Sequence, residues 1–141
     1  MKKVLIYILI IIICVVGFLF FKQKNNNEDF VTFKVECQSK GIYMIFYRMY
    51  INGERYADGG ISNVDHQELS PDKISTLKFP KAYFEGNDIS KISFTLSPYG
   101  KDSEEEMGTT NELKINAKYG STYNIILDGN KEEGFIIKLK K

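Results

Sequence analysis

The sequence predicts a single membrane-spanning helix followed by an all-β antiparallel sandwich. Three observations lead to this fold class. An uncharged apolar run lies at the N-terminus, residues beyond about position 30 alternate between apolar and polar types, and turn-forming residues separate the alternating runs. A small antiparallel β-barrel is the alternative architecture for the second part.

The apolar run extends over 18 residues, from Val4 to Phe21, and follows the short basic segment 1–3. As a helix it would be about 27 Å long, at roughly 1.5 Å per residue, close to the roughly 30 Å of a bilayer's hydrocarbon core. We therefore expect a transmembrane anchor over residues 4–21 and a short basic cytoplasmic tail over residues 1–3.

Two other fates of this segment are open. A signal peptidase could cut near Val15 and Gly17, or Cys14 could carry a lipid. A retained anchor is favoured because a cut there would leave four apolar residues, 18–21, at the new terminus. The two lysines before the run favour a cytoplasmic N-terminus, which places the following domain outside the cytoplasm. Abundant Lys, Ile and Asn are typical of an A/T-rich genome, so we expect a bacterial cell membrane.

Residues 22–29 are polar and lack apolar periodicity, which indicates a linker. Residues 30–141 form the expected extracytoplasmic domain, with seven or eight short strands. Its apolar positions alternate with polar ones in four sets: Val31 to Cys37, Ile92 to Leu96, Leu113 to Ala117, and Tyr123 to Leu127, which faces Phe135 to Leu139. Hairpin signals such as Asn52-Gly53 and Asp128-Gly129 lie between such runs. This spacing favours an immunoglobulin-like or transthyretin-like sandwich.

Composition excludes several classes of function. A net charge of +1 argues against nucleic-acid binding, and two cysteines with one histidine argue against common metal centres. His66 follows Asp65 without a recognisable nucleophile motif and is expected in a solvated loop; Cys37 is expected as a buried, inert thiol. We expect no enzyme activity and no cofactor.

Two acidic segments receive structural interpretations. Asp128, Asn130 and Glu132 have the spacing of calcium-loop ligands, but Glu133 stands where such a loop needs glycine, so a plain hairpin turn is favoured. The three consecutive glutamates, 104–106, are expected in a solvated loop.

Residues 42–51 are the most informative stretch, because both faces of this strand are apolar or aromatic. A two-residue hairpin at Asn52-Gly53 would pair Ile51 with Glu54, Tyr50 with Arg55, Met49 with Tyr56 and Arg48 with Ala57. One face would then hold Ile42, Met44, Phe46, Arg48 and Tyr50, and the other would send Tyr43, Ile45, Tyr47, Met49 and Ile51 into the core. A β-bulge would instead exchange the faces midway and bury Ile42, Met44 and Phe46.

The first of these faces is expected to bind a protein through Phe46, Arg48, Tyr50 and Arg55. Arginine and aromatic residues are enriched in protein interfaces, and the only two arginines of the chain fall on this surface. We therefore expect a membrane-tethered module that binds another envelope or secreted protein, as an accessory component of an envelope or secretion complex. A membrane-anchored immunity protein that neutralises a toxin is one alternative, and a small-ligand or carbohydrate-binding module is another.

Overall fold

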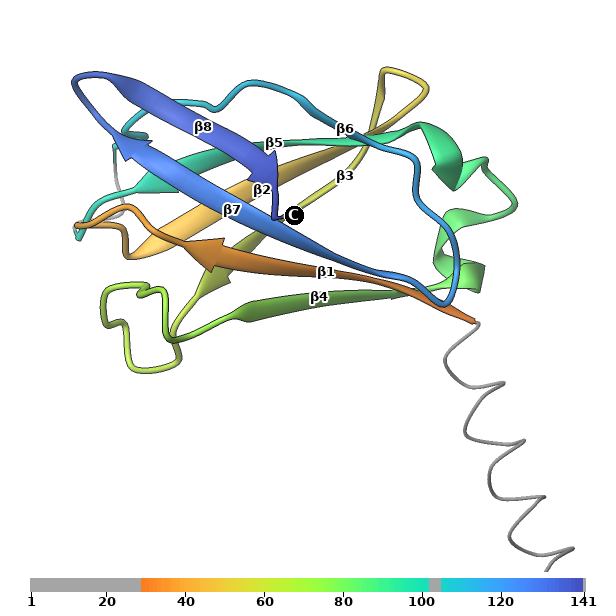
Figure 1. The fold of residues 1–141 in the computed structure, drawn as a ribbon, viewed down its shortest axis with the longest axis horizontal. Coiled ribbons are helices and arrows are strands. Elements are labelled where there is room, and N and C mark those ends of the chain that lie inside the picture. Colours follow the sequence, from red (N-terminus) through yellow and green to blue (C-terminus); the bar gives the residue numbers. More distant parts are fainter. Residues whose placement is uncertain (1–28, 102–104, 141) are drawn as a thin grey trace, which may run out of the picture.

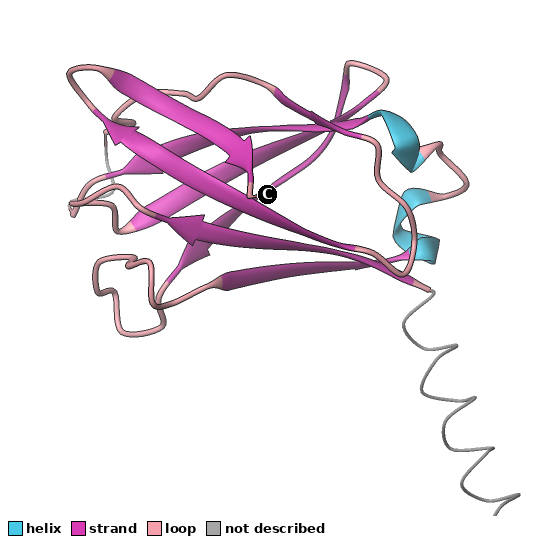
Figure 2. Ribbon diagram, in the orientation of Figure 1, coloured by secondary structure: helices cyan, strands magenta, loops and turns pink. Residues whose placement is uncertain are grey.

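A computed structural model describes residues 29–101 and 105–140 of the 141-residue chain. Strands dominate this part of the molecule (Figure 2). The elements are β1 (Phe30–Cys37), β2 (Met44–Ile51), β3 (Glu54–Ser62), β4 (Ser75–Pro80), the 3-10 helices η1 (Lys81–Phe84) and η2 (Ile89–Lys91), β5 (Ile92–Tyr99), β6 (Leu113–Ile115), β7 (Thr122–Asn130) and β8 (Gly134–Leu139).

The expected tail, the anchor over 4–21 and all but the last residue of the linker lie outside the described residues. Within 29–101 and 105–140, the helices are too short to span a bilayer.

The strands form two four-stranded sheets that pack as a sandwich (Figure 1). One sheet has the order β4-β1-β7-β8 and the other has the order β3-β2-β5-β6. The all-β sandwich prediction is therefore confirmed, and the strands do not close into one barrel. One pairing departs from the antiparallel expectation, because β1 and β7 run parallel.

The core lies between the sheets and is filled by alternate residues of the inner strands. Phe33 is fully buried at its centre, where its ring meets Phe94 of the opposite sheet edge-on at 4.7 Å between centroids. The predicted inward sets on β1, β5 and β7 are buried or half-buried. Leu139 pairs with Ile125 as the predicted hairpin requires, but 40% of it remains exposed at the chain's end.

An aromatic cluster closes the core where the border strands β3 and β4 lie. Tyr56 of β3 stacks on Phe84 of η1 at 5.9 Å, and its hydroxyl donates to the Tyr83 carbonyl at 2.6 Å. Phe79 of β4 packs on Phe84 and Tyr83. These contacts connect segments far apart in the sequence, and they hold β3 in place at Tyr56.

The β2–β3 hairpin begins in the predicted register and then departs from it. Asn52 and Gly53 both have positive φ, as a two-residue turn of type I′ requires. Ile51 pairs with Glu54 and Tyr50 with Arg55, as predicted. A bulge at Tyr56 then shifts the register, so that Met49 pairs with Ala57 and Arg48 with Asp58. The two pairs predicted for these positions are wrong because Tyr56 turns toward Phe84.

The bulge lies in β3, so the faces of β2 are not exchanged. Ile45, Tyr47, Met49 and Ile51 are buried, and the residues between them face outward. The placement of Ile42 on the outer face is wrong, because Ile42 precedes β2 and does not follow its alternation. Ile42 is fully buried, and its carbonyl accepts from the Leu69 amide at 2.7 Å. Tyr43 is only half-buried.

Candidate binding face

The outer face of the β3-β2-β5-β6 sheet holds all four residues expected to bind a partner. Phe46, Arg48 and Tyr50 alternate along β2 and are half-buried, and Arg55 of β3 lies opposite Tyr50. Met44 continues the row at the start of β2. We call Met44, Phe46, Arg48 and Tyr50 the β2 stripe; with Arg55 it places three large apolar or aromatic side chains beside two cations.

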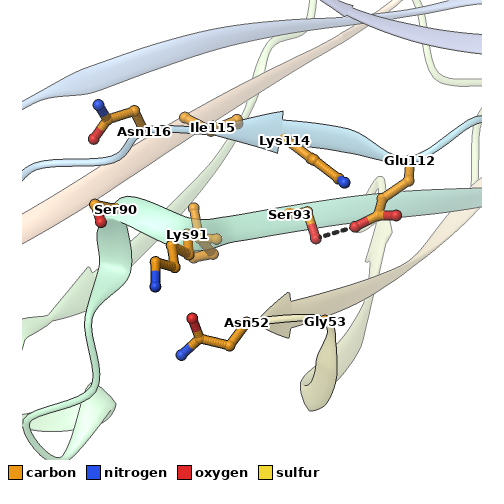
Figure 3. Close-up of a pocket in the computed structure, with 10 residues that line it drawn as sticks. Asn52, Gly53, Ser90, Lys91, Ser93, Glu112, Lys114, Ile115 and Asn116 are labelled. Atoms are coloured by element: carbon orange, nitrogen blue, oxygen red, sulfur yellow. Dashed lines mark hydrogen bonds between the residues drawn. The ribbon is translucent and has the colours of Figure 1, made fainter.

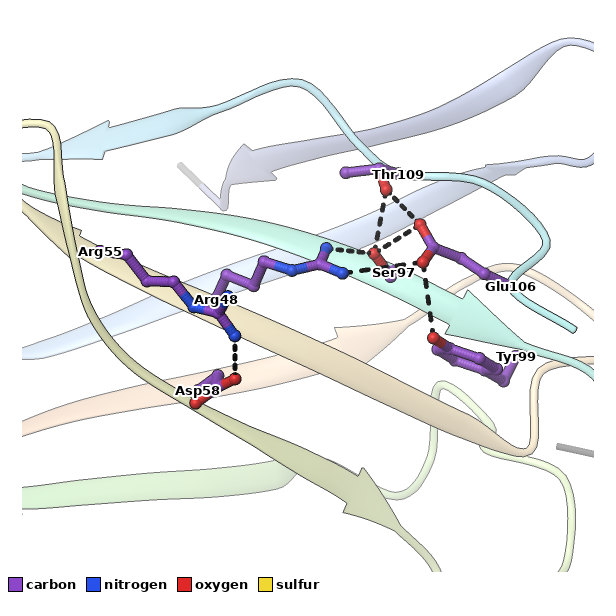
Figure 4. Close-up of polar contacts among 7 residues, drawn as sticks. All are labelled: Arg48, Arg55, Asp58, Ser97, Tyr99, Glu106 and Thr109. Atoms are coloured by element: carbon purple, nitrogen blue, oxygen red, sulfur yellow. Dashed lines mark hydrogen bonds and ion pairs between the residues drawn. The ribbon is translucent and has the colours of Figure 1, made fainter. Parts of the chain in front are cut away.

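Arg48 is held by the sheet itself. Its Nη1 donates to Ser97 Oγ of β5 at 2.9 Å, and its Nη2 lies 3.7 Å from Glu106 Oε2. The guanidinium carbon also lies 5.3 Å from the centroid of the Phe46 ring. Figure 4 shows the contacts of Arg48 with Ser97 and Glu106. Arg48 therefore fixes the stripe to β5 as well as contributing charge to the surface.

Glu106 is the anionic centre of this network. Its carboxylate accepts from the Thr109 hydroxyl, from Ser97 at 2.9 Å and from Tyr99 at 3.4 Å. These hydrogen bonds, that of Thr109 above all, hold the pKa of Glu106 below its usual range, and the charge of Arg48 adds to the effect. Glu106 is thereby kept ionised on the outer face of β5.

The prediction of a solvated loop for the three glutamates is wrong at Glu106. The backbone around it lies on β5, where the Met107 amide donates to Pro98 and the Thr110 amide to Leu96, each at 2.9 Å. Glu105 does lie at the surface, with Lys131 3.1 Å away, and Glu104 lies outside the described residues. A signal for the Glu106 site was present in β5, whose outward positions 93, 95 and 97 all carry hydroxyls.

Arg55 is the more accessible of the two arginines. It forms an ion pair with Asp58 in which 59% of the arginine side chain and 38% of the aspartate side chain remain exposed (Figure 4). Asp58 reaches this face only because the bulge at Tyr56 turns it outward. Sequence reasoning missed Asp58 for that reason.

A polar hollow of about 590 Å³ lies at one end of the same sheet (Figure 3). Ser93 donates to Glu112 at 2.6 Å inside it, and Lys91, Lys114 and Asn52 stand around it. A smaller hollow of about 270 Å³ lies beside the other end of β2, lined by Tyr43, Met44, Ser62, His66 and Lys101.

The other residues considered for chemistry, His66 with Asp65 and Cys37, have environments that suit a structural role. His66 is exposed, while Asp65 accepts from the Gln67 amide and lies 3.9 Å from Lys73. Cys37 is 2% exposed, as predicted, and burial raises the pKa of its thiol to about 11.

The Asp128 segment forms a β-hairpin turn, in which Asn130 Oδ1 accepts the amides of Glu132 and Glu133, both at 2.9 Å. Across residues 29–101 and 105–140, the acidic, histidine and cysteine side chains form no cluster of three suited to a metal ion.

No protein-family model matches this chain, and a search of curated proteins finds no match either. The candidate site therefore rests on its own geometry.

Proposed function

We propose that this chain is a membrane-tethered, extracytoplasmic β-sandwich that binds another protein, as an accessory component of an envelope or secretion complex. The observation that supports it most is the β2 stripe, a row of large side chains on the outward face of a strand. Residues 4–21 would anchor the chain in a bacterial cell membrane, with residues 1–3 on the cytoplasmic side.

The two outer faces of the sandwich differ in a way that favours the β2 stripe. The outward residues of β1, at the centre of the other sheet, are Phe30 at its start and then Thr32, Lys34 and Glu36, which suit contact with water. Ile126 of β7 and Ile136 of β8 also face outward on that sheet, but no aromatic residue or arginine lies beside them on these two strands. The stripe instead presents Phe46 and Tyr50, with Arg55 beside them. Aromatic and arginine side chains contribute most of the binding energy at many interfaces, and lysine is depleted there.

We also propose that the sandwich is transthyretin-like rather than immunoglobulin-like. Immunoglobulin domains place their first two strands side by side in one sheet. Here β1 and β2 lie in different sheets, with β1 between β4 and β7.

The polar hollow at Ser93 favours a second candidate, a small-ligand or carbohydrate-binding module. Its volume falls within the range of ligand sites, roughly 300–1,000 Å³. Lys91, Lys114 and Asn52 would offer donors to a hydroxyl-rich or anionic molecule. A membrane-anchored immunity protein would use the β2 stripe in the same way and differ only in binding a toxin.

The test is a crosslinked capture from intact cells with a C-terminal tag on the full chain. We compare the parent with a Tyr50→Ala/Arg55→Ala variant, and with Lys34→Ala on the opposite sheet as the matched control. Arg48 is left in place because its substitution would disturb the network with Ser97 and Glu106. We expect one dominant partner whose yield falls in the double variant only; equal yields from all three chains would refute the proposal.

The identity of that partner separates the candidates. Envelope or secretion machinery supports the proposed function, whereas a toxin supports the immunity protein. Absence of any partner from cells that contain abundant chain would favour the hollow as a ligand site.

A further inference from the structure

The edge strands of the sandwich differ in how their unpaired backbone groups are protected from pairing with another chain. β6 has only three residues, and β4 carries Lys78 and Pro80, both of which discourage pairing with another strand. On β8, the Asn111 side chain accepts the Ile137 amide at 2.9 Å and donates to the Ile137 carbonyl at 3.3 Å. Asn111 thus occupies the position that a pairing strand would take.

β3 lacks these forms of protection. It has nine residues, and its segment from Ala57 to Ser62 contains neither lysine nor proline. The one charged residue in that segment, Asp58, already forms an ion pair with Arg55. The bulge at Tyr56 lies outside the segment and leaves six residues of regular ladder with β2.

The ladder shows which backbone groups of β3 point outward. The Asn52 amide donates to Lys91 on the β5 side, in register with the β2–β5 pairs, so the even-numbered residues of β2 bond to β5. The odd-numbered residues of β2 therefore bond to their β3 partners, Ala57, Gly59 and Ile61. The N–H and C=O groups of the residues between them, Asp58, Gly60 and Ser62, point away from the sheet. Within the described part of the chain, no backbone group outside the ladder bonds to these three residues.

Gly60 leaves a gap in the row of side chains on the outer face of this edge strand. It pairs with Phe46, and a Cβ added at Gly60 would meet only the Met44 sulfur, at 3.9 Å. Phe46 therefore faces no side chain from its direct partner on β3. A bulky apolar side chain from a neighbouring strand would cover Gly60 and contact Phe46, as aromatic residues do beside glycines on sheet edges.

We infer that β3 receives an extended segment of the partner protein as a ninth strand, paired along Asp58–Ser62. This inference rests on the proposed protein-binding function and specifies how the partner is recognised. The outward amides and carbonyls of β3 supply the main-chain hydrogen bonds, and the place over Gly60 selects a partner residue with a bulky apolar side chain. Phe46 and the rest of the β2 stripe then continue this contact across the sheet.

The test places a photoreactive benzoylphenylalanine in the full chain in cells, at Asp58, at Ser62 or at Tyr50. Crosslinked partner residues are then located by mass spectrometry. Strand pairing aligns residues one to one, so the contacts made from positions 58 and 62 should lie about four residues apart in one partner segment. Contacts from the two positions that fall in unrelated segments would overturn the inference.

The same experiment separates the two proposals. Capture from position 50 without capture from 58 or 62 would overturn strand addition and leave the protein-binding face in place. Absence of capture from all three positions would overturn both.

Gly60→Pro supplies the independent control. Proline removes the outward N–H and leaves the ladder with β2 intact, as edge strands tolerate. We expect capture from positions 58 and 62 to fall by at least about tenfold, a loss of about 1.4 kcal/mol. Gly60→Ala keeps the N–H and should retain most of the capture.

Thermal unfolding of each variant shows whether the domain remains folded. If Gly60→Pro unfolds, Ser62→Pro removes an outward N–H at the end of the strand instead, and capture is then measured from position 58 alone. Undiminished capture by a folded proline variant would refute main-chain pairing at β3.

Discussion

Substitution of Gly59 by alanine tests the register of the candidate face. Gly59 pairs with Tyr47, and the tyrosine ring lies directly over it. A Cβ at Gly59 would stand 2.8 Å from the Tyr47 hydroxyl oxygen and 2.9 Å from the ring atoms Cε1 and Cζ. Tyr47 is itself buried and packs edge-on against Phe79, so it has little room to move.

The magnitude follows from a comparison with the adjacent glycine. Carbon atoms in contact normally stand about 3.5–4.0 Å apart, and an overpacked methyl group costs about 1–3 kcal/mol. At Gly60 the added Cβ has only one neighbour, at 3.9 Å, which is an ordinary contact. Either substitution also stiffens the unfolded chain, which stabilises the fold by about 0.4–1 kcal/mol. That contribution cancels between the two variants, so Gly59→Ala should be about 1–3 kcal/mol less stable than Gly60→Ala.

The assay is urea unfolding of the full chain in detergent, followed by far-ultraviolet circular dichroism. With a denaturant slope of about 2 kcal/mol per molar, the midpoints of the two variants should differ by about 1 M. Gly60→Ala should unfold at or above the midpoint of the parent. The reverse order of stability would show that Tyr47 covers Gly60 instead, and that the register after the bulge is displaced by one residue.

Three further predictions concern single side chains. Arg48→Ala should lower the free energy of unfolding by about 1–3 kcal/mol, because it removes both the charged hydrogen bond to the buried Ser97 hydroxyl and the cation beside Glu106. Arg55→Ala, which removes an exposed ion pair, should change it by less than about 0.5 kcal/mol; similar losses in urea midpoint would contradict the network. The pKa of Glu106 is lower in the folded than in the unfolded chain, so its stabilisation is complete above about pH 4.5 and is lost as the pH falls through the folded value. Glu106→Gln should therefore flatten the acid limb of a stability–pH curve, and an unchanged limb would count against this. In a Cys14→Ser background, Cys37 should resist iodoacetamide at pH 8 until urea unfolds the domain, because burial raises its pKa to about 11; rapid labelling of the folded chain would show that the thiol is accessible.

Local patterns in the sequence were sufficient for much of the fold. The alternation from Val31 to Cys37 and the Asn52-Gly53 turn each determine their element within a few residues, and the structure confirms both. Strand β4 was not predicted, because its six residues end in proline and contain only two inward apolar positions, Leu77 and Phe79. The parallel pairing of β1 with β7 joins residues about ninety positions apart, and no local pattern encodes it.

The candidate site likewise has a part that local sequence patterns predict and a part that depends on contacts between distant segments. The shared face of Phe46, Arg48 and Tyr50 follows from the two-residue period of one strand. The bulge that brings Asp58 to this face depends on Tyr56 packing against Phe84, a contact between distant segments. Likewise, Glu106 is drawn from a run of acids by the hydroxyls and the arginine of other strands, which only the tertiary structure brings together.

Hydroxyl-radical footprinting measures whether a partner covers the β2 stripe in the cell. Oxidation of Met44, Phe46 and Tyr50 is compared between native membranes and the purified full chain in detergent, with Ile136 on β8, 49% exposed, as the internal reference. If a partner covers the stripe, its three residues are oxidised less in native membranes while the oxidation of Ile136 is unchanged. Equal oxidation of the stripe in both samples, or protection of Ile136 instead, would contradict it.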